Sequence, residues 1–541
     1  MQRKKQSFIE GAAVLVAASL IVKVIGAVFQ IPLKNLIGSH GYPAFGLFSM
    51  AYRIYTAMLV VSTVGLPAAL SKMIAEATAM GREREVRRIV KVAAGVFVPI
   101  GAVGSAALYF GAGAFAAWIK NPDAALAVKA IAPSVLMVAV LSVFRGYYQG
   151  RSNMVPTALS QVIEAMGKLC VGLGLAYYAM GRGLDAPVVA ALTVLGVTIG
   201  EIAAALYMVL GRVAARREAV TVRQLSDAVR PAGSLCKTLL SLSVPITISS
   251  AVMSVTDLID VALISDRLQS PAIGMTAEQA SATYGVYTGM AVNFFNLPQT
   301  LITAIAVSVL PAVAGAVAGQ NFTKVSRLMG TAFRMTMLIT LPAGAGFLLL
   351  SKPILRLLYR SDTELGGTLM GILGLAVPMV ALVAITNAIL QALGRADLPL
   401  FSMFLGALVK LFADYCLLAN PRFGIKGAPM STALCYAGIA LLNLFQIGRL
   451  SRALPPLGKT LVRPLAATVG MSAATYICFT LLTRALDAAP GSAADKLATL
   501  AAILTAVVVY AVLLLALRAV EREDVLLLPK GEKIADVLHL K

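Results

Sequence analysis

The chain has little charge for its length. Only 13% of its 541 residues are charged, whereas 59% are hydrophobic. A soluble domain carries roughly 25% charged residues, so the composition excludes an ordinary soluble protein. Apolar stretches recur along the whole chain, and crossing a bilayer takes about 20 such residues. The sequence therefore predicts an integral membrane protein.

Histidine and cysteine are too few and too scattered for a metal centre or a disulfide framework. The two histidines are His40 and His539, and the five cysteines lie in or beside apolar stretches without metal-ligand spacing. We expect the cysteines to pack, and we expect no metal or cofactor. The net charge of +21 does not indicate nucleic-acid binding, because its basic residues cluster in particular loops, as membrane topology requires.

The apolar stretches predict an all-α membrane protein of about fourteen transmembrane helices. None of the connecting loops is long enough to form a separate domain. The predicted spans are 9–36, 44–71, 90–113, 125–148, 155–180, 186–211, 239–265, 281–315, 328–350, 367–392, 397–419, 427–448, 461–484 and 496–519.

Lysine and arginine are concentrated in every second loop. The basic residues before the first span, in the loops at 72–91, 212–237 and 449–463, and after the last span outnumber those in the intervening loops. Cytoplasmic loops carry this excess, so we expect both termini in the cytoplasm. The loop with Arg356 and Arg360 fits this pattern least well.

A faint internal repeat divides the chain. The sequence of residues 66–89 resembles that of 310–329, and 149–169 resembles 392–411, both at a separation of roughly 240 residues. We therefore expect two six-helix lobes in parallel orientation around a V-shaped central cavity, with two further helices. The predicted domains are an N-lobe at 1–225, a C-lobe at 226–455, and the last two helices with the tail at 456–541. This architecture is typical of alternating-access transporters.

Ionisable residues inside the first-half spans indicate a substrate site. A central lysine or arginine costs about 2.5–3.5 kcal/mol on insertion scales, so such groups face a partner or a cavity. Glu164 and Lys168 lie one turn apart, in the order that favours an ion pair. Either they form a structural pair or they contact the cargo. Lys23 and Arg53 have no nearby acidic residue in the sequence and indicate an anion site, with snorkelling of Arg53 as the alternative.

Basic groups in a low-dielectric cavity suit a diphosphate. Arginine offers a planar fork to phosphate oxygens and lysine a point charge, while amide side chains suit sugars. The predicted substrate-binding residues are Lys23, Gln30, Arg53, Gln161, Glu164, Lys168 and Asn296.

Acidic residues in the second half indicate an ion-coupling site. Asp257 and Asp260 lie on the seventh span at a depth similar to that of Asp414 on the eleventh, and Lys410 precedes Asp414 by one turn. A carboxylate cluster within the membrane binds a cation or protons. Permanent neutralisation by Lys410 is the alternative.

Three stretches of sequence resemble one family of transporters. They are LIVKVIGAVFQIPLKNLIG, LPAALSK and RGYYQGRSNMVPTALSQVIEAMGK. They resemble the polysaccharide-biosynthesis and stage V sporulation protein B family of the multidrug/oligosaccharidyl-lipid/polysaccharide superfamily, which includes MurJ-like lipid II flippases. The resemblance implies a non-enzymatic flippase of the bacterial cytoplasmic membrane that moves a polyprenyl-diphosphate-linked sugar to the outer leaflet. It also implies membrane lipids and cell-wall synthesis proteins as partners.

The resemblance also assigns residues. Lys23 matches the first essential basic residue of the lipid II flippases, and Arg53 lies in the corresponding part of the second helix. The second basic residue that this family carries on its first helix is missing here, where the chain has Gln30. Asp257 and Asp414 fill two of the positions at which sodium-linked members bind their ion, but Lys410 replaces an asparagine. This implies sodium-independent transport, driven by the membrane potential or by protons.

Two other functions compete with this interpretation. A cation-coupled drug efflux antiporter of the same superfamily would have an apolar or acidic cavity, which Lys23, Arg53 and Lys168 argue against. A membrane enzyme acting on the same lipid would need catalytic acids in sizeable loops, and the loops here are short. A flippase for another polysaccharide-lipid intermediate stays an alternative within transport.

Overall fold

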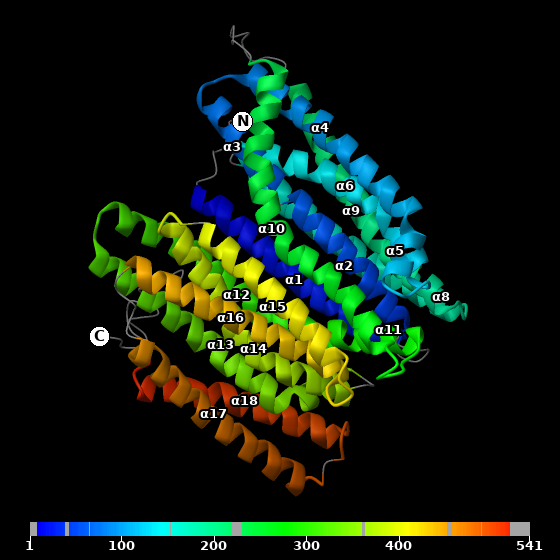
Figure 1. Ribbon diagram of the computed structural model, residues 1–541, viewed down its shortest axis with the longest axis vertical. Coiled ribbons are helices and arrows are strands. Elements are labelled where there is room, and N and C mark those ends of the chain that lie inside the picture. Colours follow the sequence, from blue (N-terminus) through cyan, green and yellow to red (C-terminus); the bar gives the residue numbers. More distant parts are fainter. Residues whose placement is uncertain are drawn as a thin grey trace. The chain divides into compact units, whose positions relative to one another are not determined.

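The computed structural model describes residues 8–37, 43–63, 65–151, 153–218, 230–359, 363–395, 397–451, 457–487 and 489–519. All regular elements in these ranges are helices, and no strand occurs in them (Figure 1). The chain is therefore an all-α protein, as its sequence predicts. It divides into two compact units, Met1–Gly285 and Val286–Lys541. The predicted lobe boundary at 225–226 lies outside the described residues and stays a prediction.

The first unit is built around two long helices, α6 and α9, which pack against each other. Helix α6 also contacts α2, α3 and α4, and α10 packs against α2, α3 and α4. The helices are α1 (Phe8–Ile37), α2 (Pro43–Thr63), α3 (Gly65–Ala79), α4 (Glu83–Phe110), α5 (Ala112–Trp118), α6 (Ala124–Gly150), α7 (Val155–Met166), η1 (Gly167–Gly172), α8 (Leu173–Gly181), α9 (Ala186–Glu218), α10 (Ala232–Leu268) and α11 (Ala277–Val286).

The second unit is centred on α14, which packs against α12, α13 and α16. Helices α17 and α18 form an antiparallel pair against α13 (Figure 1). The helices are η3 (Tyr287–Val292), α12 (Asn293–Ala318), α13 (Phe322–Leu358), α14 (Thr363–Ala392), α15 (Asp397–Leu418), η4 (Gly424–Lys426), α16 (Gly427–Ser451), α17 (Leu457–Ala485) and α18 (Ala493–Ala516).

Local sequence signals account for several helix starts. The side chain of Asn321 accepts a hydrogen bond from the backbone N–H of Lys324 at 2.9 Å and caps α13. Ser492 caps α18 in the same way through the N–H of Asp495. Pro156 stands in the first turn of α7, where its missing N–H costs no hydrogen bond.

The fourteen predicted apolar segments all fall in helical parts of the chain. The second predicted span covers α2 and the start of α3, with residue 64 between them outside the described residues. Eleven helical segments of the described residues are long and apolar enough to cross a membrane. The count of fourteen crossings stays a prediction.

Large apolar side chains cover the outside of these helices. Phe110 is 84% exposed, Phe412 72% and Leu504 65%. Soluble monomers rarely expose extended apolar patches of this kind, whereas lipid tails surround them at no cost. The exposed apolar surface thus agrees with a multi-pass membrane protein.

Glycines allow α9 to approach the segment formed by α7 and η1 very closely. A Cβ atom added to Gly196 would collide with the backbone of Gly172, and one added to Gly200 would lie 2.7 Å from the carbonyl oxygen of Glu164. Small residues at helix crossings permit such contact between backbones. The crossing brings Glu201, the residue after Gly200, close to Glu164.

We predict that the variant Gly196→Ala lowers the stability of the first unit. Overpacking a close contact costs about 1–3 kcal/mol, more than the helix propensity gained by replacing glycine with alanine. Thermal unfolding in detergent, followed by a thiol-reactive dye, measures this effect. The control is Gly174→Ala, because a Cβ atom at Gly174 meets nothing within 4 Å. Equal melting temperatures for both variants would contradict the close crossing.

Candidate functional site

Glu164 belongs to a buried network whose members come from three helices. The hydroxyl of Tyr55 on α2 donates a hydrogen bond to its Oε1 at 2.9 Å. Arg145 on α6 donates through Nη2 to its Oε2 at 3.0 Å and through Nε to the hydroxyl of Ser160 at 3.0 Å. Arg145 is only 5% exposed. The ionic partner of Glu164 is therefore Arg145, and the ion pair with Lys168 that the sequence spacing favours is not formed.

A second carboxyl group joins this network from α9. The hydroxyl of Tyr55 also forms a hydrogen bond with Oε1 of Glu201. The side chain of Glu201 is fully buried, and its Oε2 has no hydrogen-bond partner among the described residues. The carboxyl groups of Glu164 and Glu201, on neighbouring helices, thus both form a hydrogen bond with the Tyr55 hydroxyl.

Lys168 lies on η1, between aromatic rings. Its Nζ is 5.1 Å from the centre of the Phe29 ring and 4.7 Å from that of Tyr52, and it donates a hydrogen bond to the Tyr52 hydroxyl at 3.3 Å. No acidic side chain among the described residues forms an ion pair with Lys168. Cation–π contacts stabilise an ammonium by about 0.5–2 kcal/mol and leave its charge uncompensated.

An aromatic row joins the two environments. Ring centres are 5.7 Å apart between Phe29 and Phe48, 5.7 Å between Phe48 and Tyr52, and 5.5 Å between Tyr52 and Tyr55. Tyr52 contacts Lys168, and Tyr55 contacts the carboxyl groups. The row, carried by α1 and α2, thus links the ammonium group to the buried acids.

Arg53 and Asp257, predicted for two different sites, lie together in the first unit. Nη1 of Arg53 on α2 is 3.6 Å from Oδ2 of Asp257 on α10. The two side chains are 26% and 50% exposed, so solvent screens this long contact. Asp260 follows one turn later on α10 and is half-buried.

The other predicted substrate residues of the first unit lie on α1 and α7. The side chain of Lys23 is exposed. Gln30 and Gln161 are half-buried, and the Oε1 atom of each is buried with no hydrogen-bond partner in the described part of the chain. Each of these amide oxygens therefore has unused hydrogen-bonding capacity.

In the second unit, Lys410 and Asp414 form a buried pair on α15. Their Nζ and Oδ2 atoms are 2.8 Å apart, and Ser431 donates a hydrogen bond to the other carboxylate oxygen. An ammonium group thus occupies one side of the predicted ion-coupling carboxylate. Asn296 on α12 is exposed and accepts a hydrogen bond from Gln299 at 3.3 Å.

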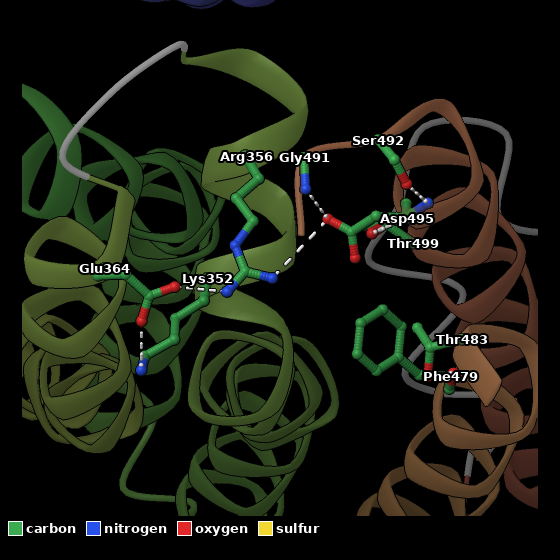
Figure 2. Close-up of polar contacts among 9 residues, drawn as sticks. All are labelled: Lys352, Arg356, Glu364, Phe479, Thr483, Gly491, Ser492, Asp495 and Thr499. Carbon is green, nitrogen blue, oxygen red and sulfur yellow. Dashed lines mark hydrogen bonds and ion pairs between the residues drawn. The ribbon is translucent and has the colours of Figure 1, made fainter. Parts of the chain in front are cut away.

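A separate charged cluster lies at the ends of α13, α14 and α18 (Figure 2). Glu364 forms ion pairs with Lys352, at 2.7 Å, and with Arg356. Arg356 also reaches Oδ2 of Asp495 at 3.7 Å. A cavity of about 450 Å³ lies beside both cations and the ring of Phe479. Two cations and two carboxylates balance, so the cluster connects helices and presents no net charge.

The most buried members of the network are not among the predicted site residues. Arg145 and Glu201 had a sequence signal, because each is an ionisable residue in an apolar stretch, and Tyr55 had a weaker one as a polar aromatic residue near Arg53. Spacing along the chain favoured the wrong partner for Glu164, because Arg145 is 19 residues away. Only the packing of α6 against α7 brings them together.

Comparisons with known proteins agree with this architecture. The family model for "Polysaccharide biosynthesis protein" matches residues 8–317, and the MatE model matches residues 245–416. Three relatives from Bacillus subtilis (strain 168) align with most of the chain. They are the uncharacterized membrane protein YabM (26% identical, covering 98% of this chain and 96% of its own), stage V sporulation protein B (23%, covering 97% and 98%) and the lipid II flippase MurJ (22%, covering 82% and 82%).

The fold also matches a solved structure. A lipid II flippase MurJ in an inward closed conformation superimposes with a TM-score of 0.69 at 15% identity, covering 92% of this chain and 97% of the other. Family and fold are those of membrane transporters and flippases, not of enzymes. The chain therefore belongs to the polysaccharide biosynthesis protein family of the multidrug/oligosaccharidyl-lipid/polysaccharide superfamily and is a MurJ-like multi-pass membrane protein.

Proposed function

We propose that this protein is an alternating-access flippase that moves a polyprenyl-diphosphate-linked sugar, lipid II, from the inner to the outer leaflet of the cytoplasmic membrane. The relatives include a protein named as a lipid II flippase and one named as a sporulation protein. The first of these names supports lipid II as the cargo, and cell-wall synthesis proteins are the partners we expect.

The environment of Lys168 carries this proposal. Its ammonium group lies against two aromatic rings and a phenol, while the nearby carboxylate of Glu164 is bound by Arg145. The lysine therefore keeps its positive charge for an incoming anion. A diphosphate supplies the oxygens that an ammonium group binds by charge-assisted hydrogen bonds.

The remaining site residues have complementary roles in this proposal. Lys23 is exposed, and the contact of Arg53 with Asp257 is long and screened by solvent, so both cations stay accessible to an anionic headgroup. The unpartnered oxygens of Gln30 and Gln161 accept hydrogen bonds from sugar hydroxyls. Asn296, in the second unit, stays a predicted polar contact to the sugar. Glu164 acts through Arg145 and does not itself touch the cargo.

The coupling part of the proposal concerns Lys410 and the acids. An ammonium group bound to Asp414 takes the place of a metal cation, which supports transport that does not need sodium. The membrane potential or protons would then drive the cycle, with Asp257 and Asp260 as the other acidic members. Both termini lie in the cytoplasm in this scheme; the basic residues at 3–5 and in the tail after 519 lie outside the described residues.

The alternative is a cation-coupled drug efflux antiporter, which the MatE match over residues 245–416 favours. The two functions need opposite charges in the first-unit site. An unneutralised Lys168 repels cationic drugs and attracts anionic lipids. A flippase for another polyprenyl-linked glycan would share the diphosphate contacts and differ in its sugar contacts.

We predict that Lys168→Ala lowers translocation of fluorescent lipid II in proteoliposomes about tenfold, because a charge-assisted hydrogen bond contributes about 1.5–3 kcal/mol. Lys168→Arg should retain most activity, since it keeps the charge. The matched control is Lys324→Ala, an exposed lysine on α13. The assay scores the dye accessible to a membrane-impermeant quencher.

Three outcomes would count against this proposal. Equal translocation by wild type and Lys168→Ala would remove the site from the transport path. Transport of cationic dyes but not of lipid II would favour the efflux antiporter, and transport of a different polyprenyl-linked glycan alone would change the cargo.

We also predict that transport continues when only the sodium gradient is collapsed. Proteoliposomes with equal sodium on both sides should translocate lipid II at an unchanged rate, because Lys410 already neutralises Asp414. Lys410→Asn removes that ammonium group and should make the rate respond to sodium. Loss of wild-type transport on sodium equilibration alone would refute the sodium-independent scheme.

A further inference from the structure

We propose that Glu201 carries an exchangeable proton, that Tyr55 relays this proton to Glu164, and that its presence favours binding of the anionic cargo at Lys168. The link to cargo rests on the function proposed above. The proton site itself stands on the geometry of the buried network alone.

The hydrogen bonds of Tyr55 require a proton on one of its two neighbours. A phenol has one proton to donate, yet its oxygen is within hydrogen-bond distance of both Glu164 and Glu201. If Tyr55 donates to Glu164, its oxygen accepts from Glu201, which must then be a carboxylic acid. Arg145 already donates to Glu164, so Glu164 is the ionised partner and Glu201 the protonated one.

The charges of the network lead to the same assignment. Arg145 supplies one positive charge to two carboxyl groups, and it is 5% exposed while Glu201 is fully buried. A net buried negative charge without a partner is strongly unfavourable. One proton on Glu201 makes the network neutral. The Oε2 atom of Glu201, which no donor approaches, is acceptable in an acid but costly in a carboxylate.

The same contacts provide a path for the proton. The O–H bond of Glu201 breaks as the proton passes to the oxygen of Tyr55, and the phenol proton passes to Oε1 of Glu164. Tyr55 ends unchanged, Glu201 becomes a carboxylate and Glu164 an acid, so charge and atoms balance. Glu164 is 20% exposed at its side chain and is the point of exchange with water.

Release of the proton changes the charge next to the cargo site. The network goes from neutral to one negative charge, and Lys168 lies one turn from Glu164 and contacts the network through Tyr52. This negative charge competes with an anionic cargo for the ammonium group. Proton binding and cargo binding therefore favour each other.

Among the described residues, the groups around Glu201 include no second cation that neutralises it. Helices α2, α6 and α7 present Tyr55, Arg145 and Glu164, and Tyr52 and Lys168 follow beyond Tyr55. The tyrosines of α8, which also packs against α9, are exposed. Arg145 is thus shared, and the proton completes the charge balance.

Infrared spectroscopy of the full-length protein in detergent tests the proton site without any cargo. At neutral pH the wild type should show a carboxylic-acid C=O band that disappears at high pH. Glu201→Gln should lack it, and Glu278→Gln, which changes an exposed acid in the same unit, should retain it. Absence of the band in the wild type at neutral pH would overturn the proposal even if the variants failed to fold.

Binding of lipid II at different pH values tests the coupling. Wild-type affinity should fall about tenfold between neutral pH and the pH at which the band disappears, whereas Glu201→Gln, which mimics the acid, should bind equally at both. Equal pH dependence in the two proteins would overturn the coupling. A titrating band in a protein that does not bind lipid II at all would leave the proton site standing and refute the proposed cargo instead.

Discussion

The ion pair between Arg145 and Glu164 sets the electrostatics of the first unit. A buried carboxylate must be paired or protonated, and without Arg145 the nearest cation along the chain is Lys168, one turn away. Because Arg145 binds Glu164 at 3.0 Å, Lys168 is left against aromatic rings with its charge available. The same arginine cannot also neutralise Glu201, which makes a proton necessary there.

The helix packing makes this arrangement possible. Glycine contacts between α9 and the α7–η1 segment bring two carboxyl groups to one phenol. Lys168 itself lies in η1, a π-helical segment, and such segments occur often at functional sites. In the second unit, by contrast, Lys410 and Asp414 neutralise each other on one helix. The two units therefore neutralise buried charge in different ways. The first unit uses a proton shared between two carboxyl groups, and the second uses an ion pair within one helix.

Hydropathy predicted the helical membrane fold well, because apolar runs of this length have few other structures. The sequence also showed which ionisable residues lie inside apolar spans, including Glu164 and Lys168. Their partners were not predictable, because the pairs that matter, such as Arg145 with Glu164 and Arg53 with Asp257, join different helices. Local spacing detects only pairs within one helix, as with Lys410 and Asp414.

The central claim is that Arg145 keeps Lys168 available by binding Glu164. A double-mutant cycle measured by native mass spectrometry with lipid II tests it most directly. Arg145→Met should weaken lipid II binding, because Glu164 is then released to neutralise Lys168. Adding Glu164→Gln to that variant should restore binding, with undecaprenyl phosphate and the melting temperature as controls for specificity and folding. If the double variant is folded and binds no better than Arg145→Met alone, Arg145 does not act through Glu164 and the account is wrong.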